Sequence, residues 1–319
     1  MPGQLHPDVG TEIQSAYYQD PSLIERKTKK RIFHASLKLL NITLNDVIHY
    51  IFILIIGSLE FQQNSSAYKD FLLPILLLNL IVKTSLQFLH YEFFINYFFL
   101  LSMKNMTLLR RFYQKTCFLG AAWSIFCVIT IVLGNALNLN LIFLDENTSR
   151  KISYYSLIML PGLLSYSIRI PTQMICSQHY NNFQGLFSLI NLLVSLTTIA
   201  ALSAIGLSST SLVAISTSLS ECILVVTLFV LSISVRTINP KLLALMDDFY
   251  DVKEFVQYLL QKRAIRLIDR ALIEFYFLIA IYMTSVDLRN LFYFRSYLLI
   301  GFTLTSCIWL GEKAYIWDG

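Results

Sequence analysis

The sequence predicts an all-α polytopic membrane protein with about eight transmembrane helices, and its composition and apolar runs carry that prediction. Of its 319 residues, 55% are hydrophobic and 14% are charged, whereas about 25% of a soluble domain is charged. The apolar residues form successive runs, each near the roughly 20 residues that cross a bilayer as a helix. Lipid offers no partner to backbone N–H and C=O groups, so such runs must be helical.

The apolar runs follow one another along the chain, separated mostly by short polar turns. We expect spans at residues 33–58, 71–101, 117–144, 152–176, 183–205, 211–235, 265–286 and 291–311. A polar and then basic tail precedes them at 1–31, without the apolar core of a cleavable signal peptide. The one long internal connection, 236–264, is amphipathic and mixed in charge, which is typical of a helix at the cytoplasmic membrane surface.

Lysine and arginine are distributed unevenly between the two sides of the predicted bundle. They cluster in the N-terminal tail, after the second span and around the long connection. The connections on the other side hold Lys69, Arg150, Lys151 and Arg289. Cytoplasmic loops are enriched in these residue types. The pattern therefore predicts a multi-pass protein with a cytoplasmic N-terminus, in the plasma membrane or a vacuole-like membrane.

Two stretches in the middle of the chain match patterns of a known family. Pro161, Arg169 and Gln178 fall on the proline, arginine and glutamine of a fourth-helix pattern. Small and apolar residues fall loosely on the junction of the fifth and sixth helices: Gly206, Leu207, Ser208, Leu212, Ala214, Ile215 and Ser216. In both patterns the chain resembles the multidrug and toxic compound extrusion (MATE) transporters.

A third stretch, Leu272–Asn290, resembles the seventh helix of plant-like MATE sequences. Glu274 stands at the first glutamate of that pattern, and Phe275 and Tyr276 stand at its aromatic pair. In the first helix the chain departs from the family, because Phe52 stands where the family has an aspartate.

The resemblance implies the fold and activity of a divergent, truncated MATE-like transporter. Residues 32–235 would form one six-helix lobe, 236–264 the connection between lobes and 265–319 the first two helices of a second lobe. The implied activity is secondary-active efflux of organic, often cationic, solutes by proton or sodium antiport through alternating access. The expected partners are a small-molecule organic solute, a coupling proton or sodium ion and membrane lipids, with no nucleic acid.

Two other functions are compatible with the sequence. A helical chemoreceptor or ion-channel subunit would explain the aromatic richness and the missing family glycines. A degenerate, non-transporting MATE relative would serve as a membrane scaffold. An enzyme is not expected, since the chain has no P-loop, GxSxG, HExxH or paired-carboxylate pattern, and we expect no cofactor and no metal.

Ionisable residues inside the predicted spans are the site candidates, because they are costly in lipid unless paired or in contact with water. Asp46 and His49 lie three residues apart in the first span, so they share a face or nearly so. This spacing indicates a proton or cation site. Arg169, deep in the fourth span, requires a carboxylate or water, and Glu221 of the sixth span is its expected partner.

Glu274 and Gln178 complete the candidates, because each stands at a residue of a MATE pattern. Lys83, His90 and Glu92 add three ionisable residues to the second span, where they can pair with other helices.

Overall fold

In the computed structural model, the described part of the chain consists of helices and the turns that join them. Described are residues 33, 36, 40, 43–59, 67–102, 106–136, 146–177, 183–234, 253, 256, 257, 268, 271, 272, 274–280 and 288–318. The labelled helices are α3 (Ala67–Leu78), η1 (Asn79–Lys83), α4 (Thr84–Ser102), α5 (Met106–Ala136), α6 (Glu146–Ser177), α7 (Phe183–Ala204), α8 (Ser209–Ser234) and α10 (Leu288–Asp318). Thr43–Leu59, called the first helix below, precedes them. No strand occurs within these ranges.

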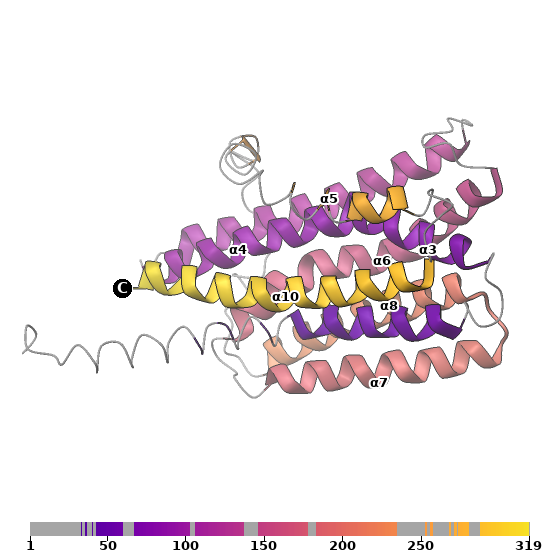
Figure 1. Ribbon diagram of the computed structural model, residues 1–319. Helices are drawn as coiled ribbons and strands as arrows, with labels where there is room; N and C mark the ends of the chain where they lie inside the picture. The colour runs from indigo at the N-terminus through magenta and orange to yellow at the C-terminus, as the bar shows by residue number, and fades with distance from the viewer. Residues whose placement is uncertain are drawn as a thin grey trace, which may run out of the picture.

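The helices lie side by side as an elongated bundle (Figure 1). By length and hydropathy, three stretches are able to cross a membrane: Phe71–Tyr97, Met106–Ala136 and Ser209–Val230. Two shorter apolar helices, the first helix and Ser188–Ala204, accompany them. This arrangement confirms the predicted all-α polytopic membrane protein.

Each of the first six predicted spans corresponds to a helical stretch, although some ends differ. The third span was expected at 117–144, but α5 already begins at Met106. The reason is that Arg110, Arg111 and Lys115 are good helix formers that extend the helix beyond its apolar part. The tail 1–31 lies outside the described residues, and the connection 236–264 is described only at residues 253, 256 and 257.

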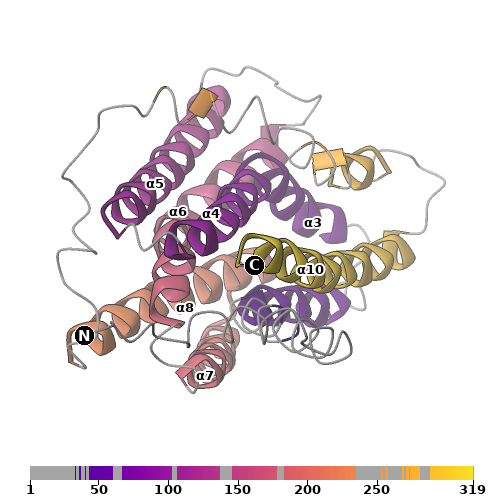
Figure 2. The ribbon, with the colours of Figure 1, turned by 90° about the vertical axis from the view of Figure 1, so that its left-hand side faces the viewer.

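Helix α6 is the central element of the bundle, and it packs against α8, α5, α3 and α4. Figure 2 shows it between α5 and α4 on one side and α8 on the other. Small residues allow two of these neighbours to come close. A Cβ atom on Gly162 would lie 2.6 Å from Cα of Ser218 on α8, and one on Gly120 of α5 would lie 2.8 Å from Cβ of Ser167. The Gly162 N–H donates a hydrogen bond to Ser218 Oγ over 2.9 Å.

The second span runs without a break from α3 through a π-helical turn, η1, into α4. Three side chains, those of Thr84, Ser85 and Trp123, donate hydrogen bonds to carbonyls of this turn, which limits the cost of the irregular backbone. Thr84 Oγ1 donates to Asn79 O over 2.8 Å, and Trp123 Nε1 of α5 donates to Ile81 O over 3.3 Å. The turn ends at Lys83, a lysine that is buried in the bundle. Such π-turns occur frequently at functional sites.

Helix α10 returns to the start of the chain and packs against α4. Two polar contacts join it to the first helix, which lies beside it in Figures 1 and 2. Ser58 Oγ and Tyr293 Oη are 2.9 Å apart, and Thr43 Oγ1 lies 3.2 Å from Cys307 Sγ. The first helix therefore lies against α10, while Ile51, Ile55 and Leu59 form an exposed apolar stripe on it.

Candidate functional site

Asp46 lies in the interior of the bundle, with only 4% of its surface exposed. It is on the first helix and faces α6, where the Tyr166 hydroxyl donates a hydrogen bond to its Oδ2 over 2.9 Å. A hydrogen bond to a charged acceptor is stronger than one between neutral groups. Tyr166 is therefore the residue that fixes the carboxyl group of Asp46.

Lys83 approaches the same tyrosine from the second span. Its Nζ lies 5.8 Å from the centre of the Tyr166 ring and 4.9 Å from the centre of the Tyr50 ring. Both distances are in the range of a cation–π contact, which is strengthened where water is excluded. The Tyr50 hydroxyl in turn accepts a hydrogen bond from Gln87 Nε2 over 3.3 Å. Lys83 thus lies against two ring faces, one of which belongs to the partner of Asp46.

Arg169 and Glu221 form a buried, two-point ion pair between α6 and α8. Arg169 Nε donates to Glu221 Oε2 over 2.6 Å, and Nη2 donates to Oε1 over 3.1 Å. Gln173 accepts a further bond from Nη1 over 2.9 Å. The guanidinium also lies 5.4 Å from the centre of the Tyr166 ring. The expected partner of Arg169 is therefore its actual partner, and Arg169 also contacts Tyr166, the residue that donates to Asp46.

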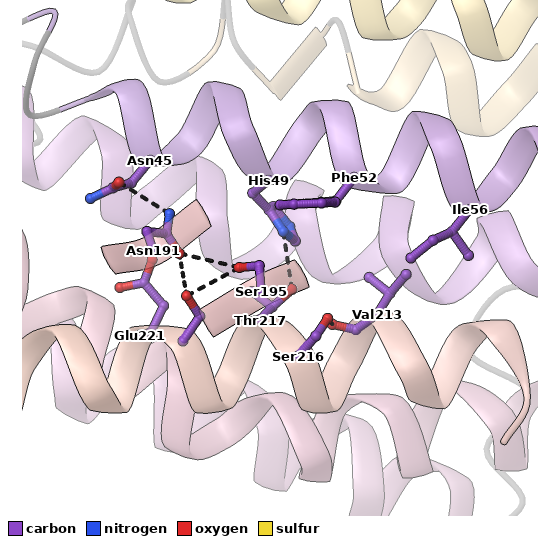
Figure 3. A pocket seen from close by; sticks show the side chains of 11 residues that line it. Asn45, His49, Phe52, Ile56, Asn191, Ser195, Val213, Ser216, Thr217 and Glu221 are labelled. Carbon is purple, nitrogen blue, oxygen red and sulfur yellow. Dashed lines mark hydrogen bonds between the residues drawn. The ribbon is translucent and has the colours of Figure 1, made fainter. Parts of the chain in front are cut away.

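A polar pocket lies between the first helix, α7 and α8 (Figure 3). Its empty space is about 350 Å³, a figure that includes its open mouth, so the enclosed part has room for water or a small ion rather than for an organic solute. The pocket is lined by Asn45, His49, Phe52, Ile56, Asn191, Ser195, Val213, Ser216, Thr217, Ser220 and Glu221. The four lining residues of the first helix follow helical spacing, so one stripe of that helix faces the pocket.

Hydrogen bonds among uncharged side chains connect the walls of this pocket (Figure 3). Asn191 of α7 donates from Nδ2 to Asn45 Oδ1 over 3.1 Å, and its Oδ1 accepts bonds from Ser195 and Ser220. His49 Nδ1 lies 3.0 Å from Thr217 Oγ1 of α8. These bonds orient several oxygen atoms toward one small volume, which is an arrangement suited to water or a small cation.

Four of the six predicted site residues lie close together, Glu274 lies elsewhere, and Gln178 lies outside the described residues. Asp46, His49, Arg169 and Glu221 come together where the first helix, α6 and α8 meet, although Asp46 and His49 form hydrogen bonds to different helices. Asp46 is not a lining residue of the pocket, whereas His49 and Glu221 are.

Glu274 forms a separate ion pair with Arg295 of α10, with Nε to Oε2 at 2.9 Å and Nη2 to Oε1 at 3.0 Å. Gln178 lies outside the described residues.

Sequence reasoning did not select Tyr166, Asn191, Ser195 and Ser220 as site residues. Asn191 and Ser195 are four apart on α7, a spacing that places both on one helix face. That signal was available, but serine and asparagine are common in any membrane bundle, so the spacing alone does not indicate a site.

Comparison with known proteins supports the architecture. The fold is similar to the crystal structure of the eukaryotic MATE transporter AtDTX14, with a TM-score of 0.64 and 14% sequence identity, over 81% of this chain and 57% of that one. The chain thus spans little more than half the length of that protein. No protein-family model matches the sequence, and no curated protein sequence matches it. This chain is an integral membrane protein with an all-α, MATE-like fold.

Proposed function

We propose that this chain is a secondary-active membrane transporter of MATE-like design, which exports organic, often cationic, solutes in exchange for protons or sodium. Within this proposal, the helices up to residue 235 form one lobe, and the helices after residue 264 begin a second. The observation that carries the proposal is a buried carboxyl group, Asp46, held by Tyr166 beside a polar pocket in a fold that resembles a transporter. Buried ionisable residues at such places in membrane proteins mark ion pathways.

Asp46 is the proposed binding site of the coupling ion. The hydroxyl of Tyr166 satisfies one oxygen of the carboxyl group when it is charged, and the lone pairs that are left can accept a proton or contact a cation. His49 and Glu221 line the neighbouring pocket. They supply a polar route by which an ion reaches the bundle interior without crossing lipid.

Arg169 and Glu221 have a supporting role in this mechanism. Their two-point pair joins α6 to α8 beside the pocket, so a change in the charge of Asp46 acts on the same tyrosine that contacts the guanidinium. Alternating access requires such coupling between ion occupancy and helix packing.

Transport by membrane vesicles tests the proposal. Inverted vesicles from cells that produce the chain are mixed with a fluorescent organic cation in the outer solution, and its uptake is driven by an imposed pH gradient or an imposed sodium gradient. We expect gradient-driven uptake by the unmodified chain and its loss in Asp46→Asn, which keeps size and hydrogen bonding but removes the ionisable group. Glu146→Gln, at the exposed start of α6, is the matched control and is expected to retain uptake.

Either of two results contradicts the proposal. Undiminished uptake by Asp46→Asn at equal protein level removes Asp46 from the mechanism. Absence of uptake by the unmodified chain under both gradients removes the transport function, and it favours a scaffold without transport activity.

A further inference from the structure

In the described helices, two buried arginines are paired with carboxylates, whereas a buried lysine lies against aromatic rings. Arg169 with Glu221 and Arg295 with Glu274 form two-point ion pairs. Lys83 is buried as well, with 8% of its surface exposed, and its contacts are the ring faces of Tyr50 and Tyr166 rather than a salt bridge. An ammonium group is costly in a membrane bundle unless a negative charge or dipole compensates it. The position of Lys83 therefore requires an explanation.

One side chain, Tyr166, contacts both Lys83 and the carboxyl group of Asp46. Tyr166 presents its ring to Lys83 and donates its hydroxyl to Asp46. Lys83 and Asp46 thus contact the same tyrosine, Lys83 at the ring face and Asp46 at the hydroxyl. Lysine has a flexible four-carbon stem and a compact charge, so its ammonium is able to move toward or away from Asp46 without a movement of the backbone.

The π-helical turn η1 contributes to this placement. Lys83 is its last residue, and Thr84 closes the turn through a hydrogen bond to Asn79 O. An inserted turn changes the direction of the side chains that follow it relative to a regular helix. The second span thus carries an irregular turn at the position where a cation is presented to the core.

We propose that Lys83 is a tethered cation that takes the place of sodium at Asp46, so that this chain couples to protons and does not require Na⁺. This inference rests on the proposed function, because it concerns the ion that Asp46 exchanges. With Asp46 charged, the ammonium compensates it across Tyr166. With Asp46 neutralised by a proton, the ammonium is held by the two ring faces. A free sodium ion would add a second positive charge to a site that is already compensated.

Thermal unfolding of the purified chain in detergent tests this inference without any need for transport. The melting temperature is measured in about 150 mM NaCl and in the same concentration of N-methyl-D-glucamine chloride, for the unmodified chain and for Lys83→Met. A ligand that binds the folded state raises its stability by mass action. We expect the melting temperature of Lys83→Met to be at least about 2 °C higher in NaCl than in N-methyl-D-glucamine chloride. The unmodified chain is expected to melt at the same temperature in both salts.

Three further variants make the result specific. Lys83→Arg keeps the charge and is expected to stay insensitive to sodium. Lys151→Met removes a lysine near the start of α6 and is expected to behave like the unmodified chain. Lys83→Met combined with Asp46→Asn removes both charges and is expected to lose the sodium response, because the carboxylate that would hold the ion is gone.

The inference is overturned if Lys83→Met shows no sodium response, or if the unmodified chain responds equally. If Lys83→Met does not fold, the test uses Lys83→Met combined with Asp46→Asn. Because this double variant lacks both charges, we expect it to fold. An unfolded double variant then contradicts the inference. The outcome of these melts is separate from that of the vesicle assay, so a chain without transport activity is distinguished from a chain in which Lys83 has no such role.

Discussion

Two buried arginine–glutamate pairs in the described helices have the same chemistry but different surroundings. Arg169 and Glu221 join α6 to α8, and the Glu221 side chain is 12% exposed because it lines the pocket. In the pair of Glu274 and Arg295 the side chains are only 2% and 1% exposed. A pair that borders a pocket can respond to an ion or to water, whereas a sealed pair can only hold helices together. The comparison thus distinguishes a pair that borders a polar pocket from a pair that is enclosed by protein on all described sides.

The largest expected effect comes from breaking the sealed pair. Glu274→Gln leaves the guanidinium of Arg295 buried without its carboxylate, and loss of one member of such a pair costs about 3–5 kcal/mol. We expect a clearly lower melting temperature in detergent. The double variant Glu274→Gln/Arg295→Met is expected to recover part of the loss. No recovery in the double variant would show that the pair is not an isolated structural unit.

The same change beside the pocket is expected to cost less stability. In Glu221→Gln, the guanidinium of Arg169 keeps its bond to Gln173 and its contact with the Tyr166 ring, and water in the pocket replaces part of the lost interaction. We expect a loss of roughly half that of Glu274→Gln, measured in the same melts. A loss equal to or greater than that of Glu274→Gln would contradict the distinction between the two pairs.

Helix packing provides a third test of the difference between the two regions. Gly162→Ala places a Cβ atom 2.6 Å from the backbone of Ser218, so α6 and α8 must separate, at a cost of about 1–3 kcal/mol. Gly301→Ala on α10 meets nothing within 4 Å and is the matched control. Because alanine favours a helix over glycine, the control is expected to melt at the same temperature or slightly higher. Equal melting temperatures for the two variants would show that α6 and α8 are not tightly packed.

The smallest expected change in stability comes from Tyr166→Phe. This variant keeps the ring that faces Lys83 and Arg169 but removes the hydroxyl that donates to Asp46. Loss of one typical intramolecular hydrogen bond costs about 0.5–1.5 kcal/mol. We expect a modest decrease in melting temperature together with a large decrease in vesicle uptake. Full uptake would mean that the orientation of Asp46 by Tyr166 is not needed.

The fold was largely predictable, because apolar runs near 20 residues in lipid have one stable solution. The pairing of Arg169 with Glu221 was also predictable, since opposite charges in two spans must find partners. The remaining site depends on contacts between distant segments. Tyr166 and Asp46 are 120 residues apart, and no local pattern reports that they meet. The π-helical turn that ends at Lys83 likewise leaves no periodic signal, because Leu80, Ile81 and Val82 are apolar like the run before them.

We propose that Asp46 binds the coupling ion, whereas the pair of Glu274 and Arg295 holds helices together. The most direct measurement compares pH-driven uptake of a fluorescent cation by Asp46→Asn and by Glu274→Gln/Arg295→Met, at equal protein level in inverted vesicles. The account predicts that Asp46→Asn abolishes uptake while the double variant retains a substantial part of it. Retained uptake in Asp46→Asn, together with loss in the double variant, would contradict the account.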